Sequence, residues 1–370
     1  MIIKSVEAFI VDLPTIRPHQ LSMHTIVKQS VVVVKIVDEN GTVGWAEVAT
    51  IGGAAYGEST PEAIKVNLEK YLVPFVIGRN ALDFGQIMND IATNIKGNTH
   101  AKSLIESALI DLVSRNKQIP AYELLGGKIH DSLPVAWTLA SGDTGRDIEE
   151  AKEMLRMKRH NIFKLKIGVG DPRKNVEHVI AIKKALGDDV RITVDVNQAW
   201  DENTANYSIA ALEDGGVAMV EQPLPTWNKE GMKRLTERFK IAIMADEAAT
   251  TVQEVFQIAK HQYGNCIALK PCKAGGLFET KKVAAVAEGA GLGLYGGTMI
   301  ESGLGTSIGV HLYSTISELK FDTEIFGPFL FKEQITVDQL EYKDFEVIVP
   351  DKPGFGLEVD EEKVKYFARE

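Results

Sequence analysis

The sequence predicts an α/β protein in which a closed barrel of alternating strands and helices follows a small α+β domain. After Leu133, short apolar runs recur eight times, and their starts lie about 24 to 30 residues apart, the length of a strand, a helix and two short loops. Amphipathic stretches separate the runs, and this alternation indicates parallel strands joined by crossover helices. Eight units within about 190 residues favour a TIM barrel, of the (β/α)8 or the modified (β/α)7β kind, over an open sheet.

The first part of the chain lacks this repeat and is expected to form a mixed α+β domain over residues 1–128. Alternating and β-branched stretches predict a small antiparallel sheet with strands over 6–13, 29–37 and 43–49. Helical patterns follow, and Gly126 and Gly127 give the stop signal after the last of them. The helices are predicted over 61–71, 82–94, 101–116 and 121–125.

The barrel is expected over residues 129–328. Its strands are predicted at 135–137, 163–165, 192–194, 218–220, 242–244, 267–269, 293–295 and 322–324. Amphipathic helices are predicted at 147–159, 176–186, 203–214, 251–261 and 277–290. The last segment, 329–370, shows extended stretches before a short helix. Because a barrel has no use for a further hairpin, this segment is expected to pack back on the N-terminal domain and complete it.

The composition is that of a globular protein, with 45% apolar and 25% charged residues among 370. The formal net charge of −10 argues against nucleic acid or an anionic membrane as a partner, since both need a basic surface. Cys266 and Cys272 are too few for a disulfide scaffold. Neither a secretory leader nor a run of ~18 apolar residues is present. A soluble cytoplasmic protein is therefore expected.

Two lysines of the second predicted strand are the first candidates for chemistry. Lys164 and Lys166 are two residues apart, so their side chains point to the same side of the strand. They alternate with Phe163 and Leu165, which take the side covered by helices. The lysines must then point into the barrel, where burial without anionic partners is costly.

Three carboxylates at successive strand ends supply these partners. Asp195, Glu221 and Asp246 end the third, fourth and fifth predicted strands, at the edge of a barrel where active sites lie. Like charges this close repel unless a cation lies between them. An all-oxygen ligand set selects Mg²⁺ or Mn²⁺ rather than zinc. Lys270 ends the sixth strand, and Glu301 follows the seventh.

Each of these residues also has a plainer explanation. An Asp at a strand end is often a helix cap, and a Lys-x-Lys pair is often a solvated face. The constellation favours instead the removal or addition of a proton next to a carboxylate, where a divalent ion stabilises the enolate charge. A basic Lys166 must be neutral to accept a proton. Its pKa is therefore expected to be depressed by Lys164, Lys270 and the metal.

These motifs resemble the enolase superfamily, which uses a Lys or His base with Mg²⁺, and within it the muconate-lactonizing family. The motifs stand in order as Lys164-x-Lys166, Asp195-x-Asn197, Glu221-Gln222-Pro223, Asp246-Glu247 and Lys270. Longer similar stretches lie at 11–19, 50–53, 137–143, 294–299 and 323–328, so the resemblance covers the whole chain.

The resemblance implies an isomerase of aromatic catabolism that cyclises a small dicarboxylate, cis,cis-muconate, through an enolate. It implies that the N-terminal domain caps the barrel, that the protein is a homo-oligomer, and that Mn²⁺ or Mg²⁺ is the cofactor. Asp195, Glu221 and Asp246 would hold the metal. Lys166 would move the proton with help from Lys164, and Lys270 would stand on the opposite face. Glu301 is grouped with these catalytic residues and would contact the far end of the substrate. The implied substrate-binding residues are Asn197, Ile51, Tyr56 and Ser141.

Several alternatives remain open. A relative with the same lysines could be a chloromuconate cycloisomerase, a dipeptide epimerase, an N-acylamino acid racemase or an o-succinylbenzoate synthase. A noncatalytic barrel would not need the lysines and carboxylates. A phosphate-binding barrel is partly suggested by Gly296 and Gly297, but no helix N-terminus is evident after them.

Overall fold

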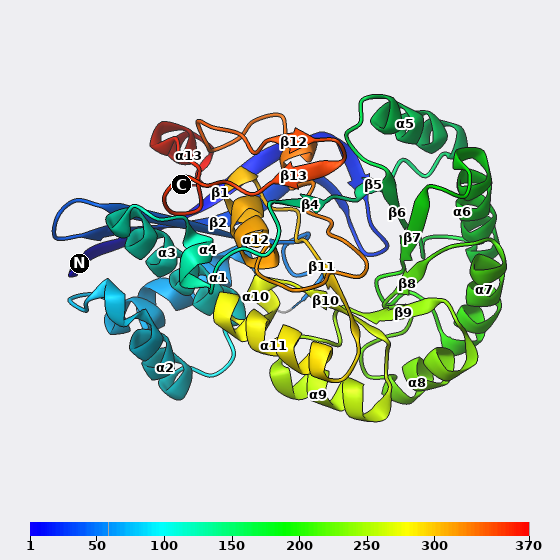
Figure 1. Ribbon diagram of the computed structural model, residues 1–370, viewed down its shortest axis with the longest axis horizontal. Coiled ribbons are helices and arrows are strands. Elements are labelled where there is room, and N and C mark those ends of the chain that lie inside the picture. The colour runs from blue at the N-terminus through cyan, green and yellow to red at the C-terminus, as the bar shows by residue number, and fades with distance from the viewer. Residues whose placement is uncertain (58, 370) are drawn as a thin grey trace.

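The computed structural model describes residues 1–57 and 59–369, and its N-terminal part is built on a three-stranded antiparallel sheet (Figure 1). The strands β1 (Ile3–Gln20), β2 (Thr25–Asp38) and β3 (Val43–Thr50) lie in that order. Four consecutive valines of β2, residues 31–34, are fully buried, so both faces of the middle strand are covered. Helix α3 (Thr99–Lys117) packs on β2 and β3. The three predicted strands are confirmed, although β1 extends well beyond the predicted 6–13 at both ends and β3 gains only Thr50.

The helices of this part follow the sheet in the chain. Thr60 caps the first helix by accepting the backbone N–H of Ala63, and Pro61 occupies the first helical turn. The predicted helix over 61–71 continues past Asn67 as a single π-helical turn rather than as α-helix. The elements are α1 (Pro61–Asn67), η1 (Leu68–Leu72), η2 (Val73–Phe75), η3 (Ala81–Asp83), α2 (Phe84–Asn94), α3 and α4 (Ala121–Leu124).

Seven parallel strands form the barrel sheet, and a single residue closes it. Thr323 makes parallel bridges to Gly296 at one edge of the sheet and to Val135 beside the other edge. The eighth predicted strand, 322–324, is therefore reduced to one bridging residue. The sheet order runs from β5 to β11, with β5 (Trp137–Leu139), β6 (Ile162–Lys166), β7 (Arg191–Asp195), β8 (Met219–Glu221), β9 (Ala242–Ala245), β10 (Cys266–Leu269) and β11 (Gly293–Gly296).

Burial on both sides of the barrel strands explains their apolar runs. Met219, Met244 and Tyr295 belong to a small cluster that is separate from the main core. Alternate residues such as Val220 and Ile243 belong to the main core instead, which the helices cover. This division is expected when inward and outward side chains alternate along barrel strands. Both cysteines are free and buried.

Helices cover the outside of the barrel, and most begin at a side chain that caps them. Asp143, Asp171, Asp201, Asn228 and Thr251 each accept a backbone N–H in the first turn of the following helix. The helices are α5 (Thr144–Arg156), α6 (Pro172–Leu186), α7 (Glu202–Asp214), α8 (Lys229–Arg238), α9 (Val252–His261), α10 (Pro271–Ala274), α11 (Leu277–Gly289) and α12 (Gly303–Tyr313).

Helices α8, α10 and α12 lie outside the predicted stretches. Every residue of α12 is buried, so it has no polar face and shows no amphipathic period in the sequence. Its presence corrects the expectation that no helix N-terminus follows Gly296 and Gly297. Ser302 caps this helix. No helix in the described part of the chain is long and apolar enough to cross a membrane.

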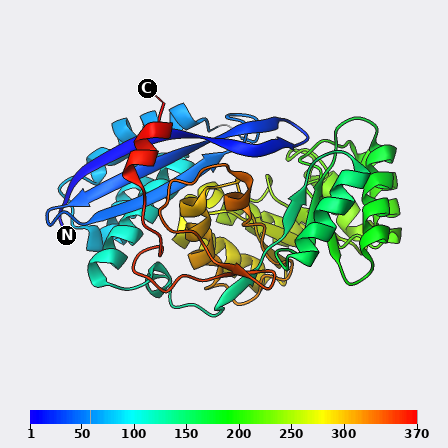
Figure 2. The ribbon, with the colours of Figure 1, turned by 90° about the horizontal axis from the view of Figure 1, so that it is seen from above.

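The C-terminal segment contacts both parts of the molecule. After η4 (Gly327–Leu330), strand β12 (Tyr342–Lys343) pairs with β13 (Glu346–Ile348), and β13 pairs with β4 (Ser132–Pro134), which precedes the first barrel strand in the chain. Helix α13 (Glu361–Phe367) then lies across the N-terminal sheet against β1 (Figure 2). The domain bounds near residues 128 and 328 stay predictions.

Candidate active site

The register of the parallel strands brings the predicted residues into one row. Lys166 is paired with Asp195 across β6 and β7, and Asp195 with Glu221 across β7 and β8. Glu221 is paired with Met244 of β9, and Asp246 follows two residues later on the same side. The strand ends that carry chemistry therefore lie side by side.

Left-handed backbone conformations follow two of these strands. Asn197 and Gln198 after β7 have φ of 44° and 68°, and Gln222 after β8 has φ of 34°. Non-glycine residues adopt such angles at a cost of about 1 to 3 kcal/mol, and they gather at functional sites. The sharp turns direct the chain out of the barrel directly behind the carboxylates.

Lys164 is fully buried between two carboxylates. Its ammonium donates to Glu221 Oε2 and to Glu324 Oε2, both at 2.5 Å. Thr138 donates to the other oxygen of Glu324 at 2.7 Å. Burial raises the pKa of Glu324, but Lys164 and Lys166 outweigh it and bring the pKa to about 2. Glu324 was not among the predicted site residues, although it ends the eighth apolar run in the way that the other carboxylates end theirs.

Lys166 pairs with the next carboxylate in the row. Its Nζ donates to Asp195 Oδ2 at 2.6 Å, and its side chain is 10% exposed. Burial lowers the pKa of Lys166, but Asp195 and Glu324 outweigh it, so the pKa is raised. The Asp195 carboxylate beside Lys166 dominates over the neighbouring Lys164. The depressed pKa that was expected from Lys164, Lys270 and the metal together stays a prediction.

Asn197 holds the Asp195 carboxylate rather than facing open space. Its backbone N–H donates to Asp195 Oδ1 at 2.8 Å and its side-chain amide to Oδ2 at 3.1 Å. The same amide reaches Glu247 Oε1 at 3.3 Å. Its contacts are those of a residue that positions Asp195.

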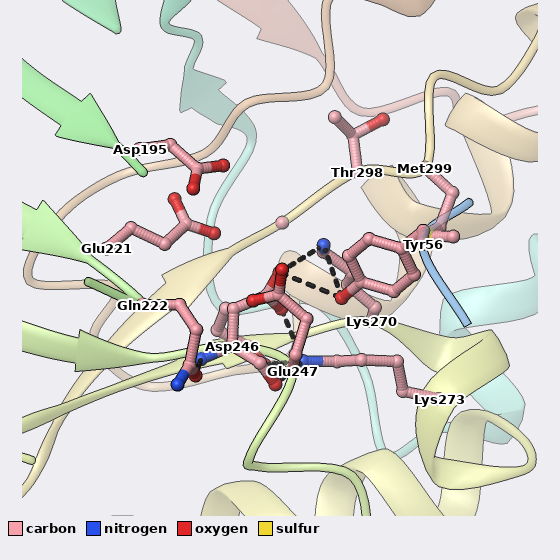
Figure 3. A network of polar contacts seen from close by, with 12 residues as sticks. Tyr56, Asp195, Glu221, Gln222, Asp246, Glu247, Lys270, Lys273, Thr298 and Met299 are labelled. Carbon is pink, nitrogen blue, oxygen red and sulfur yellow. Dashed lines mark hydrogen bonds and ion pairs between the residues drawn. The ribbon is translucent and has the colours of Figure 1, made fainter. Parts of the chain in front are cut away.

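Asp246 accepts hydrogen bonds from three side chains (Figure 3). Lys270 and the Tyr56 hydroxyl both donate to its Oδ2, at 2.7 and 2.8 Å. Lys273 donates to its Oδ1 at 2.5 Å. Burial raises the pKa of Asp246, but Lys270 and Lys273 outweigh it and hold the pKa well below its usual range. Lys273 was missed by the sequence reasoning, although it lies one helical turn after Lys270.

The negative charges around Glu221 indicate that a metal ion fits among these carboxylates. Burial raises the pKa of Glu221, Asp195 adds to this, and Lys164 opposes it, with a result of about 8. Figure 3 shows the Asp195 and Glu221 carboxylates extending from neighbouring strands into the same space. Burial and the neighbouring carboxylates disfavour the ionised form of Glu221, and a divalent cation bound among these residues would offset both effects. The oxygen-only set fits Mg²⁺ or Mn²⁺.

In the described residues no three His, Cys, Asp or Glu side chains stand close enough together to hold a metal ion. The physical reason is that each carboxylate of the row is turned toward a lysine, as the ion pairs of Asp195, Glu221 and Asp246 show. The carboxylates are thus on neighbouring strands, with their oxygens engaged by ammonium groups.

Glu301 lies in a strained turn that the N-terminal domain supports. Thr298 donates to Glu301 Oε2 at 2.5 Å. The preceding Ile300 has φ of 63°, an outlier for a β-branched residue. Gln29 of β2 donates to the carbonyl of Ile300 at 3.1 Å, and Glu47 of β3 accepts the N–H of Ser302 at 2.7 Å. Gln29 and Glu47 of the N-terminal sheet, called the cap sheet below, therefore hold this turn on either side.

The remaining predicted residues lie on loops around the row. Ser141 bonds neighbouring residues of the chain, through its N–H to Asp147 of α5 at 3.2 Å and its hydroxyl to the Asp143 carbonyl at 3.2 Å. Ile51 follows β3 and is 5% exposed. A cavity of about 360 Å³ reaches Lys166, and another of about 660 Å³ reaches Tyr56 and the β9–β10 end of the row.

Fold and site together define a β/α-barrel protein of the enolase-like class, with a separate N-terminal domain and a row of lysines and carboxylates at the strand ends. The family description "Enolase C-terminal domain-like" matches residues 146–363. The description "Mandelate racemase / muconate lactonizing enzyme, N-terminal domain" matches residues 5–126. The chain belongs to the mandelate racemase / muconate lactonizing enzyme family of the enolase superfamily, which confirms the resemblance.

Individual relatives are similar over their whole length. Muconate cycloisomerase 1 of Acinetobacter baylyi is 47% identical over 367 residues, which is 99% of either chain. A chloromuconate cycloisomerase of Cupriavidus necator is 42% identical and covers 100% of either chain. The crystal structure of the muconate lactonizing enzyme from Pseudomonas fluorescens complexed with muconolactone matches with a TM-score of 0.98 at 47% identity, covering 100% of this chain and 99% of that one.

Proposed function

We propose that this chain is a muconate cycloisomerase, a divalent-metal-dependent isomerase that interconverts cis,cis-muconate and muconolactone through an enolate. The observation that carries the proposal is the strand register that sets the Lys166 ammonium beside Asp195 and Asp195 beside Glu221. Full-length similarity to a muconate cycloisomerase at 47% identity supports the substrate.

Asp195, Glu221 and Asp246 would hold the metal, Mg²⁺ or Mn²⁺. The ion would supply positive charge that stabilises the oxygens of an enolate as negative charge develops on them. The chain's own contribution at this point is to hold the three carboxylates in a row, with Asn197 fixing Asp195 through two hydrogen bonds.

Lys166 would deliver the proton. One carboxylate of the substrate adds to the distal double bond, so that a C–O bond forms and the electron pair of the C=C bond moves toward the other carboxylate. The resulting enolate then takes a proton from the Lys166 ammonium at the carbon next to that carboxylate. One C–O and one C–H bond form, one C=C bond is lost, and Lys166 regains its proton from solvent. The Lys166 ammonium, which pairs with Asp195 at 2.6 Å, would be the donor in this step.

The other lysines would supply charge and position. Lys164 holds Glu221 and Glu324 together and adds a positive charge beside Lys166. Lys270 would face the substrate from the opposite side of the row, where it bonds Asp246 and Tyr56.

The substrate's surroundings are assigned from position. Glu301, at the turn held by the cap sheet, would contact the end of the substrate away from the metal. Ile51 and Tyr56 would shape the pocket from the loop after β3, and Ser141 from the loop after β5. The homo-oligomer, the cytoplasmic location and the preference between Mg²⁺ and Mn²⁺ stay predictions.

A chloromuconate cycloisomerase is the second candidate. A relative of that name is 42% identical over the whole chain, only slightly less than the muconate enzymes. The row of charged residues would act on the carboxylates, which both substrates carry, so it does not distinguish them. The preference between muconate and chloromuconate would depend on loop residues such as Ile51 and Tyr56.

The test is to mix the protein with Mn²⁺ and cis,cis-muconate and follow the loss of the diene's ultraviolet absorbance. We expect rapid loss that needs the metal and disappears in Lys166→Ala. Chloromuconates measured in parallel decide between the two candidates. Metal binding without any loss of absorbance on either substrate contradicts the proposal.

A further inference from the structure

Lys273 is a buried lysine beside the site that the proposed chemistry does not use. It lies on the four-residue helix α10 and is 4% exposed. Its ammonium donates to Asp246 Oδ1 at 2.5 Å, to the Asp246 carbonyl at 2.7 Å and to the Ala268 carbonyl at 3.1 Å. An ammonium has three hydrogens. All three have acceptors within the protein, so none remains for a substrate.

The contacts of Lys273 join the ends of two barrel strands. The paired register of β9 with β10 runs to Ala245 and Ile267. The next residues, Asp246 and Ala268, are bridged through the Lys273 ammonium. Lys273 therefore continues the contact between the strands at the level where the carboxylate of Asp246 emerges.

Two lysines divide the oxygens of Asp246 between them. Lys273 bonds Oδ1, whereas Lys270 and Tyr56 bond Oδ2 (Figure 3). Lys270 also bonds Tyr56, which lies on the loop after β3, so the hydrogen bonding at Oδ2 includes a residue of the N-terminal domain. Lys273 bonds only groups of the barrel itself.

We propose that Lys273 is the positioning residue for Asp246, which fixes the carboxylate and the main chain in the orientation in which Asp246 binds the metal. The inference rests on the proposed function in one respect, that Asp246 is a metal ligand. Groups that orient metal ligands in this way are typically worth 10- to 100-fold in metal affinity, as an order of magnitude.

Two effects of Lys273 on metal binding have opposite signs. Its positive charge repels a cation, so charge alone predicts tighter binding when the ammonium is removed. Its hydrogen bonds orient Asp246, so positioning predicts weaker binding. Asp246 pairs with Lys273 at 2.5 Å and with Lys270 at 2.7 Å, and the Glu247 carboxylate also acts on Lys273, so the two ammonium groups are balanced by two carboxylates. We therefore expect the loss of positioning to outweigh the loss of charge, so that removing the ammonium weakens metal binding.

Lys273→Met tests this with a neutral chain of similar length. Its matched control is Lys183→Met, because Lys183 is also buried, at 9% exposure, and also donates to three carbonyls, those of Gly187, Asp188 and Val190. Binding of Mn²⁺ alone is measured from the electron paramagnetic resonance signal of the free ion, on protein shown to be folded by circular dichroism. Lys273→Gln, which keeps an N–H donor, is measured in addition and serves if Lys273→Met does not fold.

We expect the Kd for Mn²⁺ to rise about 10- to 100-fold in Lys273→Met, to rise less in Lys273→Gln and to stay unchanged in Lys183→Met. Both methionine variants should lose thermal stability. A Kd in Lys273→Met equal to or lower than that of the wild type overturns the inference and leaves the proposed function standing. If the wild type itself binds no Mn²⁺, the proposed metal site fails and the inference fails with it.

Discussion

Asp111 of α3 connects three segments that are far apart in the chain, and removing it tests how the capping region is held together. Its carboxylate accepts the backbone N–H of Trp45 in β3 at 2.8 Å and that of Phe355 in the C-terminal segment at 2.9 Å. Arg115 donates to it at 2.8 Å. The side chain is 1% exposed, so water cannot replace it at these donors.

The magnitude for Asp111→Ala follows from these contacts. Each buried N–H left without an acceptor costs about 1 to 3 kcal/mol. Arg115 keeps its bonds to Glu358 and the Leu357 carbonyl, so it adds less. Burial raises the pKa of Asp111, which means that removing the carboxylate also relieves some unfavourable desolvation. We expect a net loss of about 3 to 5 kcal/mol in the free energy of unfolding.

The assay is urea unfolding followed by tryptophan fluorescence, with Asp90→Ala as the matched control. Asp90 pairs with Arg79 at 3.0 Å on the surface, where both side chains are about a third exposed. Such a pair contributes about 0 to 1 kcal/mol. Hydrogen exchange at Phe355 should also speed up in Asp111→Ala alone. If the two variants differ by less than about 1 kcal/mol, the role given to the buried carboxylate is refuted.

Three further predictions concern single side chains. Burial raises the pKa of Glu106 to about 7 from 4.5, so the folded chain keeps a proton that the unfolded chain loses, and this contribution to stability is lost as pH rises between those values. In urea unfolding between pH 4.5 and 7.5, the free energy of unfolding of Glu106→Gln should rise relative to that of the wild type by up to about 3 kcal/mol as pH increases. A difference between the two proteins that does not change with pH would refute this prediction. Tyr56→Phe removes the hydroxyl that donates to Asp246, and steady-state kinetics should show kcat/KM reduced about 10- to 100-fold with stability unchanged. Gln262 is exposed after α9 and has φ of 59°. Replacing it with Gly should raise the free energy of unfolding by about 1 kcal/mol in thermal unfolding, whereas replacing it with Ala should not.

Local sequence patterns predicted most of the fold and the residues at the centre of the site. The strand period of two placed Lys164 and Lys166 on one side, and parallel strand ends placed Asp195, Glu221 and Asp246 near one another before any register was known. These inferences succeed because each needs only a few neighbouring residues and the geometry of a barrel.

Other features depend on contacts that no local pattern contains. Helix α12 is buried all round, so its sequence lacks a polar face. Lys273 lies on a helix of four residues, too short to show a period. Gln29 supports the turn at Ile300 from 271 residues away. Such residues are defined by tertiary contacts, which exist only in the folded chain.

The central claim is that muconate is cyclised to an enolate that Lys166 protonates on one face. The most direct measurement is the nuclear magnetic resonance spectrum of the product formed in D₂O with Mn²⁺ present. The account predicts muconolactone with one deuterium, of a single configuration, at the carbon next to the free carboxylate, and no product from Lys166→Ala. Lactone formed at the wild-type rate by Lys166→Ala, or deuterium placed equally on both faces, would contradict it.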